Sequence, residues 1–362
     1  MIPYLYAADE TAFDSNGIGP IKDATSCVVT EELNGAFTLK LTVPRTTKRL
    51  ADLAVGKQIL AKPNPYDPAQ PFRIERVSKS LKGELEIYAP HLCYDLQHYP
   101  VGSGNYTATT LALAASYIQS TRLETRYPQF YFQDDIGSAR LGDMVIQGPV
   151  AAWDLLGSDD EENTLLGTYD VELKFDNRTV HLVAERGSDR GFVIAFGRNM
   201  TELSYEEDGA ELYTAVLSYW RKDTNYQIGD VVLATSEGYP NLHFSRVFLN
   251  DKSSDYSAKP TTSTLNADST SYIRSHPMSA PEIHIKASAV PPGSRGLKTL
   301  EELQLGDTVT IRAADLSVER TARVVQTTFD VLRGRYSSVE IDSRFAGIAT
   351  TIAKIAKRVK PV

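Results

Sequence analysis

The sequence contains one structural pattern twice, 250 positions apart. "LADLAVGKQIL" at 50–60 and "LEELQLGDTVTI" at 300–311 align so that Gly56 matches Gly306. Glycine tolerates the positive φ of a tight turn, and the alternating apolar residues that follow each glycine predict a strand. A chain that repeats such a unit is expected to form two related domains rather than one continuous core.

The match continues beyond the glycine. Arg73 and Arg323, in "FRIERV" and "ARVVQT", stand at the same separation of 250 positions, and "LKG" at 81–83 matches "LRG" at 332–334 with a shift of one residue. Each copy therefore predicts a Gly turn, a strand, a return strand, a second turn and a third strand.

A hairpin precedes each copy. Asn34-Gly35 and Asp208-Gly209 are two-residue turn signals, because the turns of tight hairpins need the positive φ that Asn, Asp and Gly tolerate best. These turns are only 174 positions apart, so the second copy carries about 76 additional residues, which we expect at roughly 222–297. Hairpins of unrelated origin can look alike, but the shared order of three elements argues for a true repeat.

The region between the copies, 99–200, predicts a mixed domain. Thr residues that can cap a helix, followed by Leu and Ala at helical spacing, predict a short amphipathic helix within "YTATTLALAASYIQS". The stretch 171–197 predicts three strands, joined at Asp176-Asn177 and at the polar turn "RGSDRG". In the additional segment of the second copy, the Ser/Thr-rich stretch 253–271 predicts an exposed loop.

Composition excludes several classes of protein. The 362 residues predict two to four domains, and the net charge of −8 argues against a broad basic surface that grips nucleic acid. Two cysteines cannot form a disulfide framework. No apolar run is long enough to cross a bilayer, and the N-terminus lacks the basic start and apolar core of a signal peptide, so we expect neither membrane insertion nor secretion.

No catalytic or phosphate-binding motif appears in the chain. The densest group of reactive side chains is His91, Cys93 and His98 in "HLCYDLQHYP". It lacks a fourth metal ligand and a partner that would orient a Cys–His nucleophile, so we interpret it as a strand end that packs into a helix. The acidic "SDDEEN" at 158–163 lacks the ligand pattern of a calcium loop and predicts a solvated turn. We therefore expect no catalytic, cofactor-binding or metal-binding residue.

Four blocks of the sequence resemble a known family. They are "YLYAADETAFDSNGIGPIKDATSCVVTEELNGAFTLKLTVP", "QPFRIERVSKSLKGELEIYAPHLCYDL", "FDNRTVHLVAERGSDRGFVIAFGRNMTEL" and "LQLGDTVTI…RTARVVQTTFDVLRGRYSSVEI". In order and spacing they resemble the phage minor structural proteins, the tail-associated or "prophage tail endopeptidase" family of long-tailed phages. The likeness covers roughly residues 2–343.

The resemblance implies a mainly β fold with a few helices, similar to baseplate hubs. It implies two related tube-type β-barrel domains and two smaller α+β or β domains. The expected boundaries are a first barrel domain at 1–98, an intervening α+β domain at 99–200, a second barrel domain at 201–343 with an inserted domain at about 223–296, and a C-terminal amphipathic helix at 344–362.

The function implied by the resemblance is structural. A homotrimer of the chain would close the distal end of the tail tube, with the distal tail ring protein and the tail tube as neighbours and a tail fibre or receptor-binding protein as a further partner. Because the tube is sixfold in this family, two similar domains in each of three chains would supply six near-equivalent surfaces. The acidic balance suits a lumen through which DNA passes without specific binding. The expected location is the virion tail tip, after assembly in the bacterial host cytoplasm.

Two other functions stay open at this point. One is a tail-associated peptidoglycan endopeptidase, the activity in the family's name, and the other is a host-surface glycan or receptor-binding protein that uses the Tyr-rich inserted domain. We expect the chain not to be an enzyme and to need no cofactor.

The C-terminal tail predicts a helix with one apolar stripe. Its members recur at alternating spacings of three and four, and isoleucine at such positions favours three- or four-stranded assemblies. The stripe is a candidate oligomer interface; packing on the chain's own second barrel and lying on a membrane surface are the alternatives. The candidate interface residues are Phe345, Ile348, Ile352, Ile355 and Val359.

Overall fold

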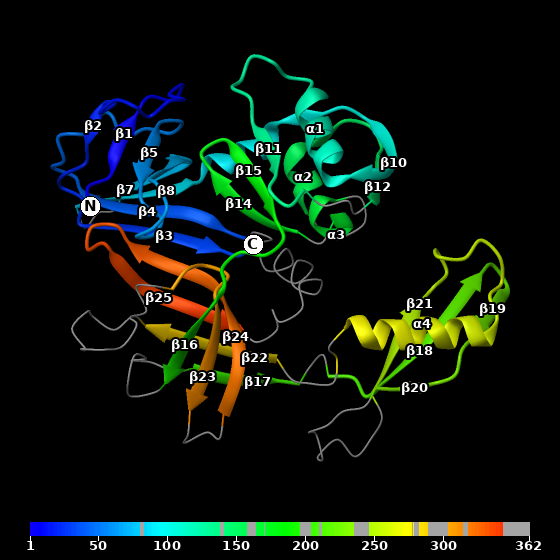
Figure 1. The fold of residues 1–362 in the computed structure, drawn as a ribbon. Coiled ribbons are helices and arrows are strands. Elements are labelled where there is room, and N and C mark those ends of the chain that lie inside the picture. The colour runs from blue at the N-terminus through cyan, green and yellow to red at the C-terminus, as the bar shows by residue number, and fades with distance from the viewer. Residues whose placement is uncertain are drawn as a thin grey trace. The chain divides into compact units, whose positions relative to one another are not determined.

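The computed structural model divides into two compact units (Figure 1). One comprises residues 1–204 with 285–346 and 351–362, and the other comprises 205–284 with 347–350. Each unit is considered by itself. The structure describes residues 1–79, 83–137, 141–157, 164–169, 171–195, 204–209, 212–234, 246–276, 278, 282–288, 303–313 and 318–342.

Strands dominate the described residues, which confirms the mainly β class with few helices. The strands are β1 (Tyr4–Tyr6), β2 (Gly19–Pro20), β3 (Ser26–Glu32), β4 (Phe37–Pro44), β5 (Gln58–Ala61), β6 (Gln70–Arg73), β7 (Arg76–Lys79), β8 (Glu84–Pro90), β9 (Pro100–Val101), β10 (Gly104–Thr110), β11 (Tyr131–Asp134), β12 (Leu141–Ile146), β13 (Val150–Ala151), β14 (Glu172–Asp176), β15 (Thr179–Val183), β16 (Asp189–Ala195), β17 (Ser204–Asp208), β18 (Ala215–Lys222), β19 (Asn225–Ile228), β20 (Val232–Leu233), β21 (Val247–Asp251), β22 (Glu282–Ser288), β23 (Thr308–Ala313), β24 (Val318–Asp330) and β25 (Arg335–Asp342). The helices are the 3₁₀ helix η1 (Leu92–His98) and the α-helices α1 (Leu111–Ser120), α2 (Ala152–Leu156), α3 (Leu165–Tyr169) and α4 (Thr262–Ser275).

The largest sheet contains strands from both copies of the repeat, whereas β5 and β6 of the first copy lie in a separate four-stranded sheet of order β2-β1-β5-β6. The strands of the largest sheet follow the order β17-β22-β25-β24-β3-β4-β8-β7, with β23 also paired to β24 and β16 to β23. The blue strands β3 and β4 and the orange strands β24 and β25 therefore lie in one sheet (Figure 1). Within β3 and β4, every second residue is buried, which is the alternation expected of a sheet with one face on a core.

The strand pairing of the two copies is the same, position for position. Gln58 pairs with Arg73 where β5 meets β6, and Thr308 pairs with Arg323 where β23 meets β24, each pair shifted by 250 positions. The long strand β24 covers the positions of both β6 and β7. The predicted relation between the two Gly-turn segments is therefore confirmed in the strand register.

The predicted turn at Asp208-Gly209 is wrong. β17 ends at Asp208 and lies beside β22 in the large sheet, whereas β18 pairs with β19, β20 and β21. β18 has the apolar alternation of a return strand and follows the turn signal directly, but β22, more than 70 residues later, occupies the position that β4 has in the first copy. The compact unit accordingly begins at Tyr205, earlier than the predicted additional segment 222–297.

The region between the copies follows the local predictions. α1 begins after Thr110, whose side chain accepts a hydrogen bond from Leu113 N, and its apolar face is buried. β14 and β15 form a hairpin, and Asn177 at their turn has a φ of 53°. β16 follows as the third predicted strand, although it pairs in parallel with β23 rather than with its neighbours in the chain.

In the second unit, α4 packs on one face of the sheet formed by β18 to β21. The predicted exposed loop at 253–271 is wrong in its second half, because α4 begins at Thr262. Thr261 caps this helix, and Leu265 and Ser269 on its inner face are fully buried. The Ser269 hydroxyl contacts the Ser218 hydroxyl at 2.7 Å, so hydroxyl side chains occupy core positions here by bonding to each other.

The barrel part of the predicted fold class stays a prediction. The pairings of the described strands close no sheet within one chain, so the large sheet is open at β7 and at β17. No helix in the described part of the chain is long and apolar enough to span a membrane.

Candidate functional site

The His91–Cys93–His98 group is a packed strand end, as predicted. β8 ends at Pro90, and His91 then caps η1 by accepting a hydrogen bond on Nδ1 from Cys93 N at 3.1 Å. The His91 ring is fully buried and stacks on Phe37 at 4.5 Å, whereas His98 is exposed at the other end of η1. The described residues contain no group of His, Cys, Asp and Glu side chains that could hold a metal ion.

Burial sets the chemistry of this group. Desolvation lowers the pKa of His91 to about 3, and it raises the pKa of Cys93 well above its ordinary value. At neutral pH the imidazole is therefore neutral and the thiol is protonated. Because Nδ1 accepts from Cys93 N, the ring proton lies on Nε2, which donates to Gln70 Oε1 at 3.2 Å.

His91 connects the first repeat to the β14–β15 hairpin through Gln70. The Gln70 amide oxygen also accepts from Asn177 N at 2.7 Å, and its amide nitrogen donates to Asp176 Oδ1 at 2.9 Å. Both hairpin residues belong to the turn that the sequence predicts. The group thus positions one domain against another rather than exposing a reactive atom.

We expect His91 to make the protein sensitive to acid. Unfolded, His91 takes up a proton near pH 6.5, but in the folded chain its pKa of about 3 prevents this, so protons favour unfolding. Stability should therefore fall by about 1.4 kcal/mol per pH unit below roughly pH 6.5. In His91→Asn, whose side chain can still cap η1, urea midpoints should fall less between pH 6.5 and 5 than in the wild type. Equal slopes for both proteins would contradict this account.

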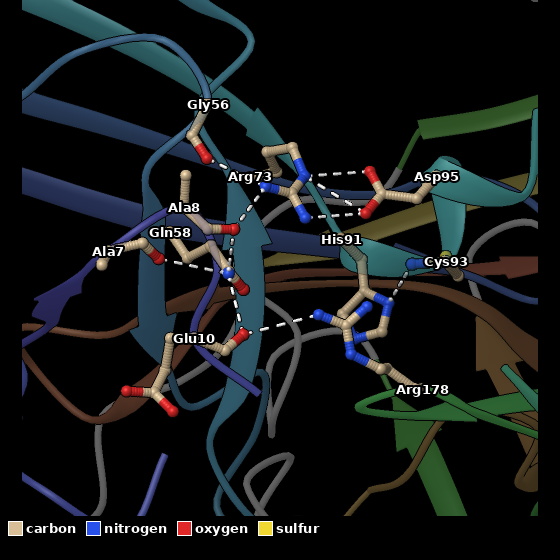
Figure 2. Close-up of polar contacts among 10 residues, drawn as sticks. All are labelled: Ala7, Ala8, Glu10, Gly56, Gln58, Arg73, His91, Cys93, Asp95 and Arg178. Atoms are coloured by element: carbon tan, nitrogen blue, oxygen red, sulfur yellow. Dashed lines mark hydrogen bonds and ion pairs between the residues drawn. The ribbon is translucent and has the colours of Figure 1, made fainter. Parts of the chain in front are cut away.

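A more exposed ionic cluster lies at the first Gly turn (Figure 2). Arg73 Nη1 donates to Gly56 O at 2.9 Å, and Nε and Nη2 hold Asp95 at 3.0 and 2.8 Å. We call Gly56, Arg73 and Asp95 the Arg73 cluster. The Arg73 and Asp95 side chains keep 27% and 30% of their surface exposed. Arg73 also donates to Ala8 O, which joins the N-terminal segment to the cluster.

The second Gly turn carries the same arrangement in a buried form. Arg323 Nε donates to Gly306 O at 3.0 Å, and its two terminal nitrogens hold Glu172 at 2.7 and 3.1 Å. We call Glu172, Gly306 and Arg323 the Arg323 cluster. The side chains of Arg323 and Glu172 are only 4% and 1% exposed.

The two glycine turns have matching backbones. Gly56 and Gly306 both have a φ of 90°. Gly56 N donates to Ile74 O and Gly306 N donates to Val324 O, both at 2.8 Å, one residue beyond the arginine in each case. The sequence identified the glycines and the arginines as matching but gave them no contacts. An arginine 17 residues after each turn glycine was the only available signal.

The surroundings of the Arg323 cluster bind the β14–β15 hairpin to both repeats. Arg186, which follows β15, holds Glu31 of β3 at 2.9 Å. At the outer edge of β14, Leu173 N donates to Asn34 Oδ1 at 2.8 Å. The hairpin therefore contacts the first copy through Asn34 and the second through Arg323, and Arg186 just after the hairpin adds the contact with Glu31. We call this region the repeat joint.

The repeat joint has the character of a structural contact. Its carboxylates, Glu31, Glu172 and Asp307, each accept from or pair with an arginine, and Asp307 also accepts from Ser188 N at 2.8 Å. Paired, buried charges of this kind fix the position of the chain. The sequence prediction missed Glu31, Glu172 and Asp307, because their partners lie far away in the chain.

The candidate interface residues, Phe345, Ile348, Ile352, Ile355 and Val359, lie outside the described residues. The same is true of the acidic stretch 158–163.

Comparison with solved structures identifies the fold. The chain is similar to prophage tail protein gp18 from Listeria monocytogenes EGD-e, with 17% identity, full coverage of both chains and a TM-score of 0.62. It is also similar to a tail protein from Neisseria meningitidis MC58, with 13% identity, 97% and 98% coverage and a TM-score of 0.59. A third match is the 43 kDa tail protein of prophage MuSo2 from Shewanella oneidensis, with 10% identity, 96% and 100% coverage and a TM-score of 0.61.

The chain thus has the fold of phage and prophage tail proteins over nearly its whole length, as the resemblance predicted. No protein-family model matches the sequence, and the search of curated proteins finds no relative.

Proposed function

We propose that three copies of the chain form a closed ring, the hub at the distal end of a phage or phage-derived tail tube. The observation that carries this proposal is the strand order of the large sheet. The block β17-β22-β25-β24 is followed by β3-β4-β8-β7, and the matching positions come in the same order in both blocks. The chain is therefore a head-to-tail pair of similar four-stranded blocks.

The junction inside the chain indicates how chains would join. β24 of one block pairs antiparallel with β3 of the next over five residue pairs. The corresponding strands at the ends of the sheet are β7, which matches β24, and β17, which matches β3. If β7 of one copy pairs with β17 of the next, the contact is heterologous, and such contacts generate a ring when the rotation closes.

Three copies follow from the symmetry of the neighbours. A sixfold tail tube, which the family resemblance implies, offers six equivalent positions. Three chains with two blocks each supply six blocks, one for each position of the sixfold tube, so that every block contacts an equivalent part of the tube. The barrels expected from the sequence would in this case be completed between chains and not inside one. We propose the tail tube and the distal tail ring protein as the partners on the tube side.

The lumen of such a ring would admit DNA without binding it. The net charge of −8 is unfavourable for phosphate contacts, which need lysine and arginine. We propose the virion tail tip as the location and a structural, non-enzymatic role.

The oligomer is tested by light scattering. A trimer should have three times the chain mass of 39.9 kDa. Proline at Val77 and at Ser78 of β7, in separate variants, provides a matched pair, because successive N–H groups of a strand point to opposite sides. The variant whose proline removes an N–H bonded to β8 should be destabilised, whereas the variant whose proline removes an outward N–H should be a folded monomer by circular dichroism. If this folded variant keeps the wild-type mass, β7 is not the contact.

The enzymatic alternative has a separate test. Purified protein in a cell-wall zymogram should leave the peptidoglycan intact. Clearing by the purified chain would contradict the purely structural role.

A further inference from the structure

The second unit contains a strand edge that is open to another chain. β19 is the last strand of its sheet among the described strands, and β18 is its partner. A shallow groove of about 420 Å³ runs along it, lined by Thr224, Asn225, Tyr226, Gln227, Ile228 and Lys259.

The register shows which backbone groups point outward. Gly229 N donates to Ser218 O, and the pairs Trp220–Gln227 and Lys222–Asn225 continue this ladder. In an antiparallel pair the intervening residues direct their N–H and C=O groups away from the partner strand. Tyr226 and Ile228 therefore direct two N–H and two C=O groups to the groove, and the Ile228 carbonyl also accepts from the side chain of Gln227 at 3.3 Å.

The side chains of the same two residues are exposed and apolar. Gln227 donates to Thr262 at the start of α4, so Tyr226 and Ile228 face the opposite side of the sheet. They are 64% and 48% exposed. Further along the same sheet, Leu233 and Leu249 are 70% and 63% exposed. This sheet face continues the apolar surface that begins at β19.

Side chains protect the edges of two other strands, β11 and β14. At β11 the side-chain oxygen of Gln119 accepts from Phe132 N, and at β14 Asn34 accepts from Leu173 N. In the described part of the chain, no side chain accepts from the outward N–H groups of Tyr226 and Ile228. The stretch "TNYQI" at 224–228 also lacks the proline or charged residues with which proteins block a strand edge.

We propose that β19 is a docking site for an extended segment of another tail protein, which adds to the sheet as a strand. The segment would carry apolar residues at alternate positions, matching Tyr226, Ile228 and the face beyond them, and an acidic residue near Lys259. At the end of the hairpin, exposed Arg221 and Lys222 add two positive charges beside the single negative charge of Asp223. The identification of the segment with a tail protein rests on the proposed function, whereas the strand addition itself does not.

A second copy of the chain fits this edge less well. Antiparallel pairing of two β19 strands is a twofold contact, which would join one ring to another rather than serve within a ring. It would also bring together two edges that both carry Lys259 and no acidic residue in the groove. Self-pairing is nevertheless an outcome that the test can detect.

The test uses the full chain and a synthetic peptide of about seven residues with valine and glutamate alternating and blocked ends. Labelled peptide should bind at roughly millimolar concentration or below and slow amide hydrogen exchange at 224–229. A version with alternate N-methylated amides, which keeps the side chains but loses the strand donors, should bind about tenfold more weakly.

Matched protein variants locate the site. Ile228→Lys should weaken peptide binding about tenfold, whereas Val231→Lys, also at a residue 48% exposed but outside β19 and the groove, should change it less than about twofold. No binding by the wild type, equal binding of the N-methylated peptide, or equal effects of the two variants would overturn the proposal. So would a wild-type oligomer that Ile228→Lys disrupts, since β19 would then pair with itself. A trimer that fails to bind the peptide would leave the proposed hub intact.

Discussion

Replacing Glu172 by glutamine is expected to lower the free energy of unfolding by about 3–5 kcal/mol. The substitution keeps the shape of the side chain but removes the buried carboxylate partner of the Arg323 guanidinium, which is 4% exposed, and leaves only the 54% exposed Glu185, 3.3 Å from Nε. A buried charge that loses its partner is costly because water cannot replace the lost contact. Urea unfolding followed by circular dichroism measures the loss.

Asp95→Asn is the matched control, since it removes the carboxylate partner of Arg73, the arginine that corresponds to Arg323 in the first copy. Arg73 and Asp95 are 27% and 30% exposed, so water can solvate Arg73 after the change, and the loss should be about 1 kcal/mol or less. Equal losses in the two variants would show that burial by the β14–β15 hairpin does not distinguish the clusters.

Gly306→Ala should have an equally large or larger effect, of about 4 kcal/mol or more. At a φ of 90° an alanine costs about 1–2 kcal/mol in backbone strain alone. In addition, its Cβ would lie 2.3 Å from Arg186 O and 2.5 Å from the carbonyl carbon, and this backbone belongs to the repeat joint. Either the turn or the segment after β15 must move.

Gly56→Ala is the corresponding control, because the two glycines have the same backbone φ but differ in the space available for a Cβ atom. Its φ is also 90°, but a Cβ there would meet no atom within 4 Å. The expected loss is therefore the strain alone, about 1–2 kcal/mol. Thermal unfolding of both variants, with the wild type, gives the comparison. A Gly306 variant as stable as the Gly56 variant would mean that the contact with Arg186 is not tight.

The features predicted from sequence are those that nearby residues determine. The turns at Asn34 and Asn177 depend on residues that accept positive φ, and both have it, at 52° and 53°. The cap at Thr110 and the buried face of α1 depend on spacing within one helix. The repeat of Gly56 in Gly306 was visible because both copies kept the glycine and its distance to the arginine.

The features missed depend on distant partners. Glu172 and Arg323 are 151 residues apart, and nothing near either residue indicates the other. The polar composition around Ser269 suggested a loop, because its bond to Ser218 was unknown. The turn signal at Asp208 predicted a hairpin, but the strand that pairs with β17 is β22, more than 70 residues later in the chain. For the same reason no local pattern could predict the order of the strand blocks.

The repeat joint explains why the two copies of the repeat differ although their turns match. The Arg73 cluster of the first copy is partly exposed, whereas the Arg323 cluster of the second copy is covered by the β14–β15 hairpin at Glu172. Both copies hold the β14–β15 hairpin, the first through Gln70 and Asn34 and the second through Arg323, but only the second buries its matching arginine beneath the hairpin.

The central claim is that three chains present six similar blocks around one axis. Electron microscopy of the purified full-length protein tests it most directly, because a reconstruction without imposed symmetry shows both the number of chains and the placement of the blocks. The account predicts a threefold ring in which the blocks β3-β4-β8-β7 and β17-β22-β25-β24 alternate at equal radius, joined by pairing of β7 with β17. A monomer, or a ring in which the two blocks lie at different radii, would contradict it.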